Sequence, residues 1–200
     1  MAGVSETIVR EFFELHGFLV RQERKYISPS RSEARAYDFL VLNPAPQAGE
    51  SELPFILEAA DLPRLTRAVV VVKGWHTETF SPARLTNAPE IFRFLEPAVF
   101  RRASRVFGDG PLTKILVVPA LPQGAEARRK SIGFLQGKGV DAVIPFRTML
   151  DNLIQQTETN RNYQKSDLLQ IIRILKNYDF FREPQLELFK SRRPPPSHPG

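Results

Sequence analysis

Two charged side chains on neighbouring predicted strands are the residues of this sequence best suited to chemistry. Asp38 lies in the segment AYDFLVLN, and Lys73 follows the valine run of AVVVVKGW. Side chains alternate across a strand, so Lys73 shares a face with Val71. Hydrolysis of a phosphodiester needs an activated water and relief of charge on the phosphate oxygens. A Mg²⁺ ion held by two carboxylates does both, and a nearby lysine can stabilise the developing charge. Here an aspartate and a lysine are present, but Val71 stands where the second acid is needed.

The elements that position these residues follow from hydrophobic periodicity and turn signals. Ile8, Phe12 and Leu15 recur at helical spacing, which predicts a helix over 5–16 that ends before Gly17. Four consecutive valines predict a strand over 67–75 that is buried on both faces. Further strands are predicted near 18–26, 35–43, 114–119 and 140–146, and helices over 88–107, 124–139 and 147–158, with a short helical turn within 55–65. This order predicts an α/β fold with a mixed central sheet and helices on both faces.

The chain divides into a main domain over 1–160, a helical extension over 161–189 and a basic, Pro-rich tail over 190–200. We expect the tail to be a disordered, solvated end. In the extension, Ser166 and Asp167 can cap a helix. Its predicted apolar stripe holds Leu168, Ile171, Ile172 and Leu175, widened by Leu169 and Ile174. We expect this helix to dock on the core; an interface to a second copy or to another protein is the alternative.

Composition limits the classes of protein to which the chain can belong. The 200 residues carry a net charge of +6, and half of it lies in the tail over 190–200. No cysteine is present, which excludes disulfides and thiolate metal sites and fits a reducing compartment such as the cytoplasm. No apolar run approaches the roughly 20 residues that span a bilayer, and the first residues lack the pattern of a signal peptide. Phosphate-binding glycine motifs and the GxSxG hydrolase motif are absent.

The arrangement resembles the restriction-endonuclease-like superfamily, also called PD-(D/E)XK nucleases, over about residues 5–146. The resemblance is carried by the first helix with Glu11 and Glu14, by Gly17 and Phe18, by YDFLVLN with Asp38, and by VVVVKGW with Lys73 and Gly74. It implies an αβββαβ core, DNA as substrate and Mg²⁺ as cofactor of active members. It also implies that Asp38 is a metal ligand and that Lys73 is its electrostatic partner. Glu11 or Glu14 would be the accessory acid that some members use.

Val71 departs from the superfamily pattern, because a valine cannot coordinate a metal ion. An acid elsewhere in the chain could replace the missing ligand, and the candidates are Glu58, Glu78 and Glu33. Structural alternatives stay open for each residue. Asp38 could bond a backbone amide, Lys73 could reach solvent, and Glu11 could belong to a solvated helix face. His76 and Glu78 could share a metal ion, although an exposed loop pair is favoured.

Three basic clusters are candidates for contacts with nucleic-acid phosphates. They are Arg21, Arg24 and Lys25 on the first strand, Arg101, Arg102 and Arg105 on one helix, and Arg128, Arg129 and Lys130 on the next. Arg101 and Arg105 are one helical turn apart and therefore lie on one side of their helix. Ordinary solvated charge is the alternative interpretation of all three clusters.

Two functions follow from the resemblance. The first is a Mg²⁺-dependent DNA nuclease in which another acid has replaced the missing ligand. The second is a catalytically impaired member that binds nucleic acid or assembles with other proteins of a DNA-processing system. The valine at position 71 favours the second, whereas the presence of both Asp38 and Lys73 favours the first. A fold alone cannot decide between them.

Overall fold

Five strands form one mixed sheet in the order β1-β2-β3-β4-β5. The computed structural model describes residues 2–23, 37–47, 52–108 and 110–181. The strands are β1 (Leu19–Gln22), β2 (Phe39–Leu42), β3 (Arg67–Val72), β4 (Thr113–Val118) and β5 (Ala142–Pro145). β2 is antiparallel to both of its neighbours, while β3, β4 and β5 run parallel to one another. The prediction of an α/β protein with a mixed sheet is confirmed.

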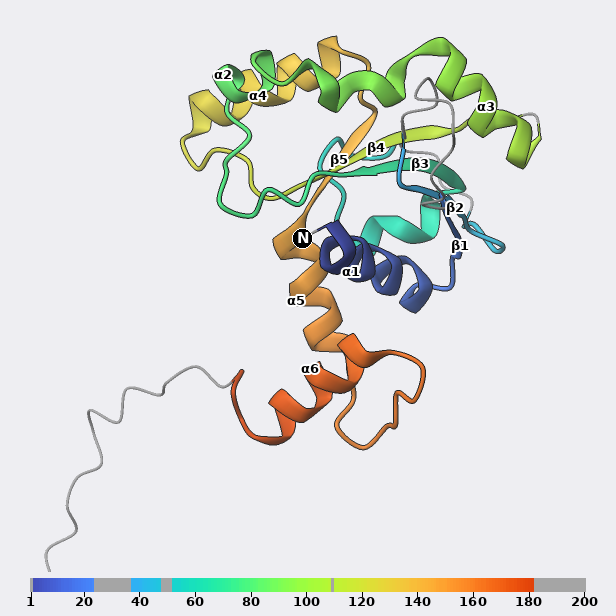
Figure 1. Ribbon diagram of the computed structural model, residues 1–200, viewed down its shortest axis with the longest axis vertical. Coiled ribbons are helices and arrows are strands. Elements are labelled where there is room, and N and C mark those ends of the chain that lie inside the picture. The colour runs from blue at the N-terminus through green and yellow to red at the C-terminus, as the bar shows by residue number, and fades with distance from the viewer. Residues whose placement is uncertain (1, 24–36, 48–51, 109, 182–200) are drawn as a thin grey trace, which may run out of the picture.

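Helices cover both faces of the sheet, because alternate residues of each strand are apolar on opposite sides (Figure 1). One face, the α1 face, packs Phe39, Val70 and Val117 against α1 (Ala2–Leu15), the 3₁₀ helix η1 (Ala59–Arg64), α5 (Phe146–Gln156) and α6 (Asp167–Asn177). The other, the α3 face, packs Leu40, Val71 and Leu116 against α2 (Pro82–Thr86), η2 (Pro89–Leu95), α3 (Pro97–Phe107) and α4 (Ala125–Gly137). The valine run of β3 therefore supplies both cores, as its composition predicted.

The single helix predicted over 88–107 is wrong, because the chain forms η2 and α3 with a break between them. Glu96 has φ −59° and ψ 134°, which is not helical. A residue that precedes proline is sterically kept from the helical region, and here Pro97 follows Glu96. Pro97 instead occupies the first turn of α3, where its missing N–H costs no hydrogen bond. The short helix α2 was not predicted from the sequence.

The C-terminal helix α6 docks on the α1-face core, as expected, but with only part of the predicted apolar stripe. The Ser166 Oγ accepts a hydrogen bond from the Leu169 backbone N–H at 3.2 Å, so the predicted cap is confirmed. Leu169 and Ile172 are buried in the α1-face core. Ile171 and Ile174, which were expected on the packed stripe, are 54% and 45% exposed. The interface with another chain that was predicted for the C-terminal segment stays a prediction.

Several predictions fall on residues outside the described ranges, among them Arg24, Lys25, Glu33 and the tail over 190–200. The strand predicted near 18–26 corresponds to β1 in the described residues. The strand predicted over 35–43 corresponds to β2. Among the described helices, none combines the length and the apolar character needed to cross a membrane.

Candidate functional site

Asp38 and Lys73 meet at the edge where β2 begins and β3 ends. The β2–β3 register pairs Phe39 with Val70, and continuing it by one residue places Asp38 opposite Val71. The Asp38 backbone N–H donates to the Val70 carbonyl at 3.0 Å, which fixes this position. The Lys73 backbone N–H donates to the Val117 carbonyl at 3.1 Å, so Lys73 continues the line of β3 along β4. Diagonal neighbours in such a pair are about 7–8 Å apart, and the two charged residues are therefore close.

The position between these two residues is filled by hydrocarbon. Val71 is 3% exposed and belongs to the α3-face core. The Asp38 Oδ2 accepts a hydrogen bond from the Val72 backbone N–H at 2.6 Å, which is the backbone contact that the sequence left open as an alternative. Lys73 is partly buried, and among the described residues none forms a hydrogen bond or ion pair with its side chain. One carboxylate beside a valine does not fit Mg²⁺, which prefers several oxygen ligands.

Replacing Asp38 with alanine is expected to lower the free energy of unfolding by about 1–3 kcal/mol, because the Val72 N–H loses its acceptor in a partly buried place. Asp38→Asn is the matched control, since it keeps one acceptor oxygen and should cost less. Urea denaturation of the three proteins gives the comparison. An alanine variant as stable as the parent would contradict the hydrogen bond.

Glu58 does not lie near this end of the sheet, and its position speaks against the predicted role as a metal ligand beside Asp38. The segment before it pairs with the outer side of β5, where the Leu57 N–H donates to the Val143 carbonyl at 2.9 Å. That segment and β2 are four strand spacings apart, or roughly 19 Å at about 4.8 Å per strand. The Glu58 side chain takes part in a capping box with Asp61 at the start of η1. Sequence alone could not show on which side of the sheet this loop lies.

Glu78 is paired with Arg84, and its role as a metal ligand stays a prediction. Its two carboxylate oxygens contact the Arg84 Nε and, at 3.0 Å, the Arg84 Nη2. The Arg84 guanidinium lies 4.6 Å from the centre of the Trp75 ring, so the pair is also held by stacking. His76 is instead hydrogen-bonded to Ser5, with 2.9 Å between the His76 Nε2 and the Ser5 Oγ. Glu78 and His76 thus have separate partners, as the exposed loop interpretation expects.

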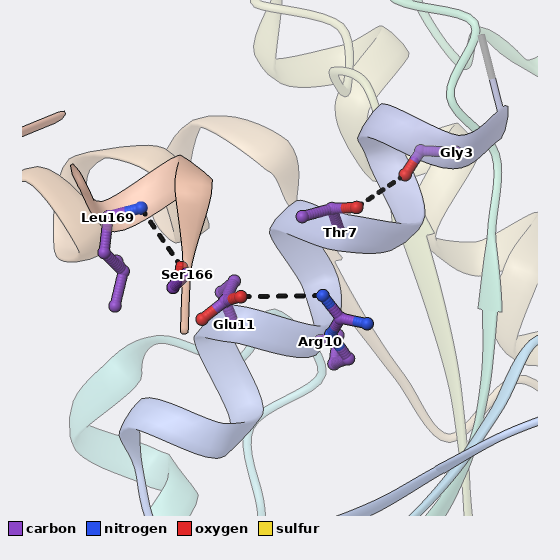
Figure 2. Close-up of polar contacts among 6 residues, drawn as sticks. All are labelled: Gly3, Thr7, Arg10, Glu11, Ser166 and Leu169. Carbon is purple, nitrogen blue, oxygen red and sulfur yellow. Dashed lines mark hydrogen bonds and ion pairs between the residues drawn. The ribbon is translucent and has the colours of Figure 1, made fainter. Parts of the chain in front are cut away.

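Glu11 faces the beginning of α6 and not the Asp38 edge (Figure 2). It is 6% exposed, and its Oε1 lies 3.6 Å from the Arg10 Nη2. Glu11 and Glu14 both line a shallow hollow between α1 and the segment that leads into α6. Burial, together with the negative charge of Glu11, raises the pKa of the Glu14 carboxyl. This position speaks against the predicted role of Glu11 as an accessory acid beside Asp38.

Glu6 is a buried carboxylate of α1 that contacts β1 through Gln22, and the sequence analysis missed it. It is 7% exposed, and its Oε2 accepts a hydrogen bond from the Gln22 Nε2 at 2.5 Å. Gln22 pairs with Phe39, the residue after Asp38. A signal was available in the sequence, because Glu6 stands three residues before Val9 and seven before Phe13, within the buried stripe of the helix.

The predicted basic clusters differ in how freely their side chains face solvent. Arg101 and Arg105 are exposed on α3, which contains no acidic residue. Arg102 forms an ion pair with Glu23 of the β1 edge, with 3.2 Å between Nη2 and Oε1. Arg128, Arg129 and Lys130 are exposed on α4, and the Lys130 Nζ lies 2.6 Å from a Glu126 oxygen. Arg101 and Arg105 of α3 therefore have no acidic residue on their own helix, whereas Lys130 of α4 is paired with Glu126.

Comparison of the chain with protein-family models, with curated proteins and with solved structures found no match. Within the described residues, no three His, Cys, Asp or Glu side chains gather into a group that could hold a metal ion.

Proposed function

We propose that this chain is a restriction-endonuclease-like protein with an incomplete metal site, and that it binds nucleic acid without cutting it. The order α1, β1, β2, β3, helices, β4 supports this proposal, because it is compatible with the αβββαβ order that the resemblance implies. The antiparallel β1-β2-β3 run followed by a parallel β4 agrees with it. The presence of Asp38 and Lys73 at one edge of this sheet supports the same kinship.

The observation that carries the proposal is the burial of Val71 directly opposite Asp38. Its side chain is 3% exposed in the core, and the Asp38 carboxylate is engaged by the Val72 N–H. A Mg²⁺ ion at this edge would meet one carboxylate and a methyl surface, where a nuclease needs two carboxylates. Glu58 lies across the sheet and Glu78 is held by Arg84, so neither supplies the second ligand.

Binding to nucleic acid is supported by the surface of α3. Arg101 and Arg105 lie one turn apart, both are exposed, and no acid on that helix neutralises them. Arginine side chains in this arrangement bind phosphates through charge and hydrogen bonds, with little dependence on base sequence. α3 packs on the same sheet face as Val71, and strand alternation places Lys73 on that face as well. A nucleic-acid strand held by α3 would therefore run over this side of the sheet.

Arg105→Ala is expected to weaken binding to a short DNA duplex by about three- to tenfold at low salt and to reduce the salt slope of log K by about one. Fluorescence anisotropy over a series of salt concentrations measures both quantities. Arg147→Ala is the matched control, because Arg147 is an exposed arginine of α5 on the opposite face of the sheet. Equal losses in the two variants would contradict a binding surface on α3.

The same preparation tests the alternative of an active nuclease, which the joint presence of Asp38 and Lys73 favours. We expect no cleavage of plasmid DNA with Mg²⁺ or Mn²⁺. Cleavage that disappears in both Asp38→Ala and Lys73→Ala proteins would refute the proposed non-catalytic function and establish the enzyme.

A further inference from the structure

A hollow of about 550 Å³ lies between α3 and β1, the first strand in the order of the described sheet. Its walls combine charged and apolar side chains from β1, from the start of β2 and from α3. The charged or polar ones are Arg21, Gln22, Glu23, Tyr37 and Arg102, and the apolar ones are Leu40 and Val106. Its volume lies within the range of about 300–1,000 Å³ that is usual for small-ligand sites. Of the basic residues that the sequence analysis named as candidates for phosphate contacts, Arg21 and Arg102 line this hollow.

The charged groups of the hollow are close enough to act on one another. The Arg102 Nη2 lies 3.2 Å from the Glu23 Oε1. Burial, and then the negative charge of Glu23, raise the pKa of the Tyr37 phenol, while Arg102 and Arg21 act in the opposite direction. Two guanidinium groups, one carboxylate and one buried phenol therefore converge on a single space. Such a set offers cationic donors for an anion and, beside them, an acceptor for an amino group.

The hollow adjoins the end of β2 at which Asp38 lies, because Glu23, which lines the hollow, is paired with Asp38. The Glu23 backbone N–H donates to the Asp38 carbonyl at 3.0 Å, which continues the β1–β2 pairing by one residue. Glu23, Asp38 and Val71 thus follow one another across three adjacent strands. A nucleic-acid strand that lies over α3 and this edge passes the mouth of the hollow.

We infer that the hollow holds one unpaired nucleotide of a nucleic-acid strand, with a preference for cytosine over thymine; this rests on the proposed function. Val106, which is 41% exposed, provides most of the apolar surface for the face of the base, because Leu40 in the same wall is 2% exposed. Arg21 and the outer side of Arg102 bind the flanking phosphate. The Glu23 carboxylate accepts a hydrogen bond from the N4 amino group of cytosine, whereas thymine presents a carbonyl oxygen at that position.

The test compares short duplexes that are blunt or carry one unpaired cytosine or thymine at each 3′ or each 5′ end. Fluorescence anisotropy is expected to show about tenfold tighter binding of a cytosine overhang than of the blunt duplex, with thymine in between. Arg21→Ala should remove the overhang preference. Glu23→Gln should remove the cytosine preference, because glutamine can donate to thymine as well as accept from cytosine.

Arg105→Ala is the control on α3, since Arg105 is exposed on the same helix as Arg102 but does not line the hollow. It should weaken binding to blunt and overhanging duplexes alike and leave the preference intact. Equal affinity of the unaltered protein for all duplexes would overturn the nucleotide site while leaving the proposed function standing. A preference that persists in both Arg21→Ala and Glu23→Gln would overturn it too. Absence of binding to every duplex would overturn the proposed function and this inference together.

Discussion

Replacing Val71 with glutamate is expected to lower the free energy of unfolding by about 2–4 kcal/mol at neutral pH in the absence of divalent cations. Val71 is 3% exposed, so the new carboxylate would be buried and would lie opposite the Asp38 carboxylate. Burial and the like charge both raise the pKa of such a glutamate. Because the folded state then binds the proton more tightly than the unfolded state, the deficit is expected to shrink as the pH falls below neutrality.

Mg²⁺ or Mn²⁺ is expected to restore part of the stability lost in Val71→Glu, because two facing carboxylates form a divalent-cation site. Thermal denaturation with and without the cation measures the recovery, and calorimetry measures the binding. Val71→Gln is the matched control: it has nearly the same shape, carries no charge and should show no such recovery. A glutamate variant as stable as the parent without metal would mean that position 71 is not enclosed opposite Asp38.

Ile172→Ala is expected to lower the free energy of unfolding by about 2–4 kcal/mol, because Ile172 is 4% exposed in the core that α6 shares with α1. Its neighbour Ile171 has the same side chain but is 54% exposed. Ile171→Ala is therefore expected to change stability by less than about 0.5 kcal/mol. Chemical denaturation of the two single variants measures the difference.

The outcome decides whether α6 is an integral part of the main domain. A single cooperative transition that shifts in Ile172→Ala and stays in place in Ile171→Ala would show that α6 unfolds with the sheet. Equal shifts in the two variants would contradict the orientation of α6. The Lys176 Nζ, which donates to the Ile154 and Thr157 carbonyls at 2.9 and 2.6 Å, helps to fix that orientation.

Local patterns were sufficient to predict most of the elements. The valine run of β3 could be recognised as a buried strand because β-branched residues without polar neighbours fit a sheet covered on both sides. Ser166 could be recognised as a helix cap because the capping hydrogen bond joins residues three apart. The single helix predicted over 88–107 is interrupted at Glu96, because the following Pro97 keeps that residue out of the helical region.

The candidate site was predicted only in part. The juxtaposition of Asp38 and Lys73 followed from the expectation that their strands are neighbours, and the β2–β3 pairing has that arrangement. The acids Glu11, Glu58 and Glu78 were chosen by position in the chain, and each has a partner or a place elsewhere. Glu6 was not predicted, because its partner Gln22 lies on β1 and the pattern of the helix by itself does not indicate that contact.

The sequence by itself determined the class of fold, the strand that carries Lys73 and the absence of an acid at position 71, since these depend on residue types and on spacing within a few turns or strands. Only the tertiary structure decided that Asp38 bonds the Val72 amide, that the loop with Glu58 lies beyond β5, and that Arg21, Tyr37 and Arg102 surround one hollow. Such contacts join residues tens of positions apart. They are set by strand register and by the packing of both sheet faces at once, which no local segment of the chain encodes.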